Sequence, residues 1–305
     1  MNFKDISLKE KRIVSGHRLC PGCITAPIIR IILSATDKDV VVACATGCLE
    51  VATTIYPHSS WNAPFIHSAF ENTAATISGI ERAYKALAKK GKIRKEIKFL
   101  AIGGDGGSYD IGLQALSGAA ERGHDFVYVC YNNEGYMNTG NQRSGATPYG
   151  ASTSTSPAGA VKKGKENFRK DLTEIMAAHG IPYVAQASPS HPFDLFEKAR
   201  KAFETKGPAF INVISPCNQW GIKSDEAVEL ADMAVRSCFW PLYEVENGKY
   251  KINFRPSKKL LIRDFASAQA RFRHLDENEI EKIQRHTDEK WERLLSRESA
   301  NEVKK

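Results

Sequence analysis

The feature that most constrains this fold is a regular alternation of short apolar runs with helical patterns. The runs are rich in β-branched residues, are bounded by Gly, Asn or Pro, and span residues 40–43, 97–102, 126–131, 182–187 and 209–214. Each run predicts a buried strand. Helical patterns accompany them at residues 68–90, 109–122, 169–179 and 191–206. The alternation predicts an α/β fold in which a parallel sheet carries helices on both faces.

Two segments depart from this alternation. Residues 139–166 are dominated by small residues, Gly and Pro, which predicts a long loop for site closure or partner contact, with a plain flexible linker as the alternative. From about Lys251 the chain becomes charged, with 14 Lys and Arg against 10 Asp and Glu, and ends in a predicted helix at residues 277–298. We therefore predict a ligand-binding domain at residues 1–250 and a docking extension at residues 251–305.

Composition and charge exclude several classes of protein. A chain with 42% hydrophobic and 26% charged residues can bury a full core, so it is not a disordered or low-complexity protein. No apolar stretch approaches the roughly eighteen residues of a membrane span, and the first residues (MNFKDISLKEKR) are too polar for a signal peptide. We expect a cytoplasmic protein with no membrane contact. The net charge of +8 does not require nucleic acid, since an acidic protein partner would satisfy it equally well.

Polar side chains follow two neighbouring predicted strands. Gly104, Asp105 and Gly106 come directly after one strand, and Asn132 and Asn133 come after the next. Because a strand, helix and strand unit returns the chain to the same edge of the sheet, Asp105 and Asn133 should converge and supply two oxygen ligands for Mg²⁺. The neighbouring glycines would admit a diphosphate, at a helix that opens nearby. A nicotinamide site lacks its G-x-G-x-x-G pattern here, and a structural glycine turn is the remaining alternative.

The seven cysteines predict a metal centre rather than disulfides, because their number is odd and their spacing uneven. Four could meet at one edge of the sheet: Cys20, Cys23, Cys48 and Cys217. Four thiolates suit a [4Fe-4S] cluster or structural zinc, and one close pair with two distant single residues favours the cluster. Cys44 could compete as a ligand, although packing at a strand end is the preferred interpretation. Cys130 and Cys238 are expected in the core.

The segment from Gly104-Asp105-Gly106 to Asn132-Asn133 resembles the thiamine diphosphate motif. The resemblance implies that Mg²⁺ is held by Asp105, by Asn133 and by the main-chain carbonyl of Gly135. It also implies a cofactor whose ylid attacks a 2-oxoacid carbonyl. The glutamate that activates this cofactor belongs, in such enzymes, to a separate pyrimidine-binding domain. No second α/β domain fits in 305 residues, so a partner subunit is expected to supply it.

Over about residues 12–245 the chain resembles the beta subunit of pyruvate:ferredoxin oxidoreductase and other 2-oxoacid:ferredoxin oxidoreductases. The resemblance rests on six motifs in order: GHRLCPGC from Gly16, CATGCLE from Cys44, IHSAFENTAA from Ile66, GGDGGSYDIGLQALSGAAERGHD from Gly103, YNNEGYMNTGNQRSGATP from Tyr131 and WPLYE from Trp240. It implies oxidative decarboxylation of a small 2-oxoacid, with pyruvate and coenzyme A giving acetyl-CoA and CO₂. Electrons would pass through a [4Fe-4S] cluster and a ferredoxin-like subunit to ferredoxin.

The resemblance also implies residue roles. Cys20, Cys23, Cys48 and Cys217 would ligate the cluster. Cys44 and Thr46 would line the cofactor side of the strand end, with Gly104 and Gly106 beside the diphosphate. Asn138 would face the substrate, and His67 could contact the cofactor, although a lone histidine is more often structural.

The chain departs from the family pattern at Ile24, Asn132, Asn141 and the pair Asn218-Gln219. Several of these changes add amide groups, which would suit a substrate more polar than pyruvate. Oxalate or another small 2-oxoacid, with or without coenzyme A, is therefore an alternative. Two further alternatives are a non-oxidative thiamine decarboxylase or synthase, which would need no cluster, and a zinc-stabilised interaction subunit.

Overall fold

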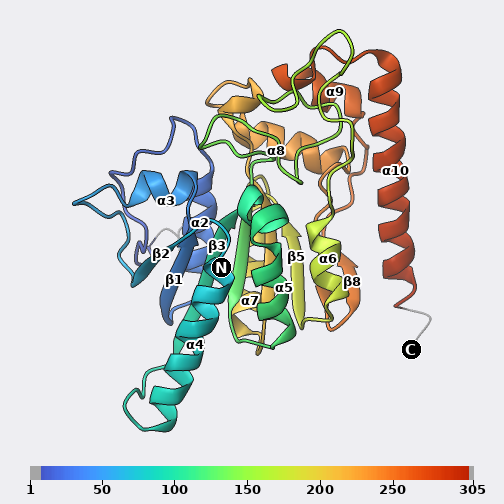
Figure 1. Cartoon of the computed structure of the whole chain (residues 1–305). Coiled ribbons are helices and arrows are strands. Elements are labelled where there is room, and N and C mark those ends of the chain that lie inside the picture. The colour runs from blue at the N-terminus through green and yellow to red at the C-terminus, as the bar shows by residue number, and fades with distance from the viewer. Residues whose placement is uncertain (1–7, 302–305) are drawn as a thin grey trace.

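The computed structural model describes residues 8–301, and its centre is an eight-stranded sheet (Figure 1). The sheet has the order β2-β1-β3-β4-β6-β5-β7-β8. The strands are β1 (Asp39–Ala45), β2 (Phe65–Ser68), β3 (Ile97–Gly104), β4 (Val127–Asn132), β5 (Tyr183–Ala187), β6 (Ala209–Ile214), β7 (Tyr243–Glu246) and β8 (Lys249–Ile252). The first six pair in parallel, and the β7–β8 hairpin joins β5 in antiparallel orientation.

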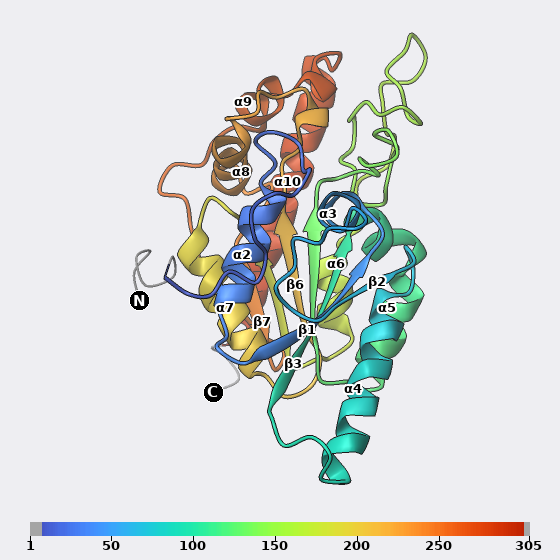
Figure 2. The same ribbon diagram turned by 90° about the vertical axis from the view of Figure 1, so that its left-hand side faces the viewer.

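Helices cover both faces of the sheet, as Figure 2 shows. One face packs against α2 (Thr25–Ser34) and α7 (Pro192–Glu204), and the other against α4 (Thr73–Lys89), α5 (Leu113–Glu121) and α6 (Leu172–Ala178). Alternate residues of β1 enter the two cores, because successive strand side chains point to opposite faces. This confirms the predicted α/β class with a parallel sheet and helices on both faces.

The apolar runs predicted the central strands well, with β1, β3, β4, β5 and β6 beginning and ending within two residues of expectation. The strands β2, β7 and β8 were not predicted, because each has only four residues, and the edge strands β2 and β8 are also only partly buried. The predicted helix at residues 109–122 is divided into a π-helix (Gly106–Ile111) and α5. A Cβ on Gly112 would lie 2.3 Å from the Gly107 carbonyl oxygen, so glycine permits this wide turn.

The charged C-terminal segment packs against the domain that precedes it. After the short helix α3 (Cys48–Thr53) near the N-terminus, the remaining helices are α8 (Ala227–Arg236), α9 (Ile262–Ser267) and α10 (Glu277–Ser299), with 3-10 turns at Asn218–Trp220 and Ala270–Phe272. The Asp276 side chain accepts a hydrogen bond from the Glu279 N–H and so caps α10. Helix α10 then runs beside β8, and Lys290 forms an ion pair with Asp171 at 2.5 Å. A docking role for residues 251–305 stays a prediction.

Residues 139–166 form the predicted long loop, which contains isolated bridges such as Thr153 with Ser156 but no helix or strand within the described chain. Its first part is buried, including Ser144 and Thr147, so this part is an ordered wall rather than a linker. Among residues 8–301, none of the helices combines the length and the apolar character that a membrane crossing demands. The polar stretch at residues 1–12, which predicts that the chain has no signal peptide, lies mostly outside the described residues.

Candidate functional site

Three oxygen-bearing groups converge at the carboxyl ends of β3 and β4. These strands are neighbours, with Gly104 paired to Tyr131, so Asp105 and Asn133 leave the sheet side by side. One amide atom of Asn133 lies 2.8 Å from Asp105 Oδ1 and 2.8 Å from the Gly135 carbonyl oxygen. Without a cation the amide nitrogen takes that position and donates to both oxygens; with a cation between them, the amide oxygen faces it instead. The residues therefore fit a Mg²⁺ site, and the expected convergence is present.

Asp105 is fully buried, and burial raises the pKa of its carboxyl to about 7. Ser144 Oγ donates a hydrogen bond to Oδ2 at 2.5 Å, and the Asn133 N–H donates to Oδ1 at 3.2 Å. Both donors are neutral, so they stabilise the carboxylate without cancelling its charge. A divalent cation would supply the missing positive charge.

Glu134, between the two predicted metal ligands, was not anticipated from the sequence. It is fully buried and has a φ of 61°, a left-handed conformation that is uncommon outside glycine. Two arginines hold its carboxylate, with Arg169 at 2.9 Å and Arg271 at 2.6 Å. Trp220 lies under the Arg271 guanidinium, 3.7 Å from ring centroid to Cζ, and donates from Nε1 to the Asn133 carbonyl at 2.7 Å. The backbone that carries the three oxygens is therefore held from several sides.

Small residues and aromatic rings shape the space beside these oxygens. A Cβ on Gly106 would lie 2.4 Å from the Tyr136 ring, and that ring stacks on Phe70 with centroids 5.6 Å apart. The hollow there is about 20 Å³, and its lining includes Gly104, Asp105, Gly106, Asn133 and Gly135. Glycine at position 106 is thus required by the close approach of the Tyr136 ring, and its place beside a diphosphate stays a prediction.

The other predicted cofactor residues lie at or near the hollow. Thr46 and Asn138 line it. His67 stands beside Thr46, with Nε2 2.7 Å from Oγ1, and its Nε2 is also 3.5 Å from the buried carboxylate of Glu50, a neighbour that the sequence did not reveal. Cys44 is fully buried in the core, where its thiol donates to the Ala45 carbonyl at 3.5 Å, and it does not line the hollow.

The four candidate cluster ligands also gather near one edge of the sheet. The loop before α2 holds Cys20 and Cys23, Cys48 begins α3, and Cys217 precedes the 3-10 turn. Burial raises the pKa of Cys48 to about 12, and the other three cysteines add to the shift. Burial likewise raises the pKa of Cys217 to about 11, with contributions from Cys23 and Cys20. Cys48 and Cys217 are therefore close enough to Cys20 and Cys23 for these thiols to contribute to their pKa values. In the part of the chain that the structure describes, no three His, Cys, Asp or Glu side chains converge on a position for a single metal ion.

The amides at the departures from the family pattern have partners or conformational roles within the chain. Asn218 Nδ2 donates to the Pro21 carbonyl at 2.9 Å and so ties the Cys217 turn to the Cys20–Cys23 loop. Asn132 Nδ2 donates to the Tyr109 hydroxyl at 2.8 Å. Asn141 has a φ of 58°, a conformation that asparagine tolerates well. Asn132, Asn141 and Asn218 therefore have roles within the chain, whereas Gln219 is exposed, and the alternative of a more polar substrate stays a prediction.

Comparison with known proteins agrees with this geometry. Residues 45–213 match the thiamine pyrophosphate enzyme family, C-terminal TPP binding domain. Over 289 residues the chain is 51% identical to pyruvate synthase subunit PorB of Methanocaldococcus jannaschii, covering 94% of this chain and 97% of the relative. The chain belongs to the beta subunits of the 2-oxoacid:ferredoxin oxidoreductase family. It is a thiamine diphosphate-binding enzyme subunit.

Other members of the oxidoreductase family show the same relationship. Pyruvate synthase subunit PorB of Thermotoga maritima is 50% identical, with 99% of this chain and 96% of the relative covered. Ketoisovalerate oxidoreductase subunit VorB of Pyrococcus furiosus is 43% identical, with 93% of each covered. A solved 2-oxoglutarate:ferredoxin oxidoreductase from Magnetococcus marinus shares the fold, with a TM-score of 0.59, 22% identity and 74% of each chain covered. The oxidoreductase beta subunit described here is thus one subunit of a larger 2-oxoacid oxidoreductase.

Proposed function

We propose that this chain is the catalytic subunit of a pyruvate:ferredoxin oxidoreductase, which converts pyruvate and coenzyme A to acetyl-CoA and CO₂. The observation that carries the proposal is the convergence of Asp105, Asn133 and the Gly135 carbonyl beside a glycine-lined hollow. Pyruvate is favoured as the substrate because identity to the two pyruvate synthase subunits is 50–51%, against 43% for the ketoisovalerate enzyme.

In this proposal Asp105, Asn133 and Gly135 would hold Mg²⁺ beside the diphosphate-binding turn. The cofactor would supply a nucleophilic carbon that can stabilise the electron pair left by decarboxylation of a 2-oxoacid. Thr46 and His67 contact the cofactor at the end of β1 and β2, and Cys44 supports that strand end from the core. Asn138, which is exposed at the rim of the hollow, donates from its amide to the substrate. Gly104 and Gly106 allow close approach of the diphosphate.

Cys20, Cys23, Cys48 and Cys217 are proposed to hold a [4Fe-4S] cluster, which would supply one-electron redox chemistry beside the thiamine site. Their mutual effect on the thiol pKa values and their common position at the sheet edge support a shared site. Iron would stabilise the thiolates, whose charge is costly in this half-buried setting. Single zinc is the competing occupant of the same residues.

We propose two partners by analogy with the relatives, which are named as subunits of pyruvate synthase. A pyrimidine-domain subunit would supply the activating glutamate, and a ferredoxin-like subunit would carry electrons to ferredoxin. The loop at residues 139–166 and the segment at residues 251–305 are the proposed contacts to these subunits. We place the complex in the cytoplasm, where a reducing environment suits free thiols and a cluster: all seven cysteines are unpaired.

The test is made on the complex purified without oxygen with its native partners. Viologen reduction is measured with pyruvate, oxalate, 2-oxoglutarate and branched 2-oxoacids, each with and without coenzyme A. Pyruvate turnover that requires coenzyme A is expected. Turnover of oxalate without coenzyme A would overturn the assignment of pyruvate as the substrate. No viologen reduction with any 2-oxoacid would overturn the assignment of the chain to an oxidoreductase.

Metal analysis tests the cluster in the same preparation, with the metal content of the separated partner subunits subtracted. Four irons per chain are expected, and Cys217→Ser should lose iron and dye reduction together. Cys130→Ala, a core cysteine on β4, is the matched control and should keep both. One zinc and no iron would overturn the cluster.

A further inference from the structure

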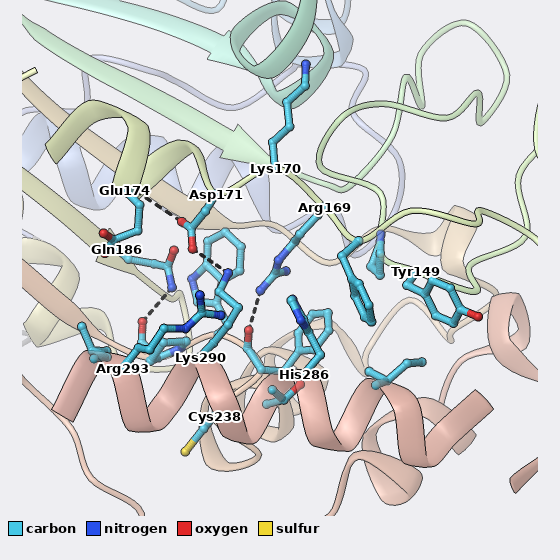
Figure 3. Close-up of a pocket in the computed structure, with 18 of the residues that line it drawn as sticks. Tyr149, Arg169, Lys170, Asp171, Glu174, Gln186, Cys238, His286, Lys290 and Arg293 are labelled. Atoms are coloured by element: carbon cyan, nitrogen blue, oxygen red, sulfur yellow. Dashed lines mark hydrogen bonds and ion pairs between the residues drawn. The ribbon is translucent and has the colours of Figure 1, made fainter. Parts of the chain in front are cut away.

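A cavity of about 330 Å³ lies between α10 and the sheet, away from the cofactor site (Figure 3). Its walls come from α10, from the segment around Arg169 and from the turn around Trp240. It shares no lining residue with the hollow beside Asp105. Its size is at the lower end of small-molecule sites. The cavity is therefore a separate candidate site that the proposed reaction does not use.

The walls of this cavity are strongly aromatic. Six rings line it: Tyr109, Tyr149, Phe168, Phe239, Trp240 and Tyr243. Phe168 stacks on His286 with centroids 3.8 Å apart, and Arg169 lies over the Phe239 and Trp240 rings. Aromatic surfaces of this kind favour a planar ring, which can stack on them.

Helix α10 turns a row of basic side chains toward the same space. His286, Lys290, Arg293 and Arg297 recur at steps of three and four residues, which places them on one helix face. Figure 3 shows His286, Lys290 and Arg293 projecting from α10 toward the segment of Arg169 and Asp171. Lys290 pairs with Asp171, and Arg297 pairs with Glu174. These two cations are already neutralised.

Three polar side chains on the α10 side of the cavity have unused hydrogen-bonding capacity. Arg293 makes one hydrogen bond, from Nε to the Glu289 carbonyl at 3.3 Å, and has no acidic partner among residues 8–301. Within the same described range, the His286 ring nitrogens and the Thr287 hydroxyl make no hydrogen bond, although Thr287 is buried. Burial, together with Lys290, Arg169 and Arg293, lowers the pKa of His286 to about 4. Asp171 and Glu174 also line the cavity, but each is paired with a cation of α10, so the donors that have no such partner favour an anionic ligand.

We propose that this cavity binds a nucleoside monophosphate, with the base against the aromatic walls and the phosphate at the α10 face. Arg293 would pair with the phosphate, and the Thr287 hydroxyl and the His286 ring would donate to it. The ligand is expected to carry both a ring and an anion, because aromatic rings and basic side chains line the same partly open cavity, with Arg293 exposed to solvent. This inference about the ligand does not depend on the thiamine site.

The test uses the folded full-length chain and calorimetric titration with AMP, adenosine and inorganic phosphate. Saturable AMP binding is expected, with adenosine and phosphate at least tenfold weaker. Arg293→Gln should weaken AMP at least tenfold. Arg285→Gln is the matched control, an exposed arginine of the same helix that does not line the cavity, and it should change nothing. Asp105→Asn should also leave AMP binding unchanged, which separates this cavity from the cofactor site.

Several outcomes would overturn the proposal. The first is the absence of saturable AMP binding to a chain whose thermal transition shows that it is folded. The second is binding of phosphate as tight as that of AMP, and the third is equal AMP affinity in wild type and Arg293→Gln. Loss of AMP binding in Asp105→Asn would assign the ligand to the thiamine site instead.

Discussion

The Arg271 guanidinium donates from Nη2 to Glu134 Oε2 at 2.6 Å across 137 residues of sequence. Both side chains are buried, so the pair is formed out of water. Glu134 stands between Asn133 and Gly135, the two proposed metal ligands that follow β4. The charged C-terminal segment therefore reaches back into the candidate metal loop and helps to hold its backbone.

Arg271→Ala is expected to weaken binding of thiamine diphosphate in the presence of Mg²⁺ about tenfold and to lower the free energy of unfolding by about 3 kcal/mol. The reason is that one of two cations on a buried carboxylate is removed, while Arg169 remains. Titration calorimetry and urea unfolding measure the two effects. Arg273→Ala, exposed two residues later, is the control and should match wild type. Unchanged cofactor affinity in a destabilised Arg271→Ala would show that the pair supports the fold alone.

Asn218→Ala is expected to release cluster iron several-fold faster to a chelator, with no change in the preference for pyruvate over oxalate. The variant removes the hydrogen bond to the Pro21 carbonyl, which links the loops that carry Cys217 and the Cys20–Cys23 pair. Iron release is followed from the loss of the cluster chromophore. Gln219→Ala, the exposed neighbouring amide, should behave as wild type. A switch of substrate preference in Asn218→Ala would restore the interpretation that this amide selects the 2-oxoacid.

Gly106→Ala should abolish measurable binding of thiamine diphosphate, because its methyl group would collide with the Tyr136 ring. Gly79→Ala is the control, since a Cβ there meets nothing within 4 Å on exposed helix α4. It should stabilise the chain by about 0.5–1 kcal/mol through helix propensity. For both variants, titration calorimetry measures the affinity for thiamine diphosphate and thermal unfolding measures the stability. Normal cofactor affinity in Gly106→Ala would place the diphosphate elsewhere.

His286 should make the chain less stable as the pH falls from about 6.5 toward 4. Its pKa is lowered in the folded chain, so in that pH window the unfolded chain binds the proton more tightly, which lowers the free energy of the unfolded state relative to the folded state. Partial exposure limits the effect to about 1 kcal/mol. Urea unfolding across this pH range should show a shallower decline for His286→Gln, whereas His58→Gln, on an exposed loop, should follow wild type. An identical decline in both variants would contradict the burial of His286 among cations. Saturating AMP should also reduce the decline, since a bound phosphate would favour the protonated ring.

Short-range sequence patterns predicted the central strands and the two polar residues that follow them. The central strands were visible because both faces are buried and their runs are continuously apolar. Asp105 and Asn133 were found for the same reason, since a residue that follows a central strand must lie at the carboxyl edge. Their convergence required no knowledge of the loops.

The residues that were missed act over long sequence separations. Glu134, Arg169 and Arg271 meet only because α6 and the C-terminal segment fold onto the turn after β4, and no spacing rule joins them. Asn218 is similar: its amide suggested substrate polarity, whereas its partner is the carbonyl of Pro21, 197 residues away. A charged C-terminal sequence likewise gives no sign that its last helix encloses an aromatic cavity.

The position of Arg271 late in the chain has a consequence for biosynthesis. A nascent chain emerges N-terminal end first, so the metal loop at Asn133 is made well before its arginine support. Until Arg271 arrives, Glu134 has Arg169 as its cation and the turn after β4 is incompletely held. We therefore expect a chain that has not yet been extended to Arg271 to hold its metal loop less firmly and to bind the cofactor more weakly than the finished chain.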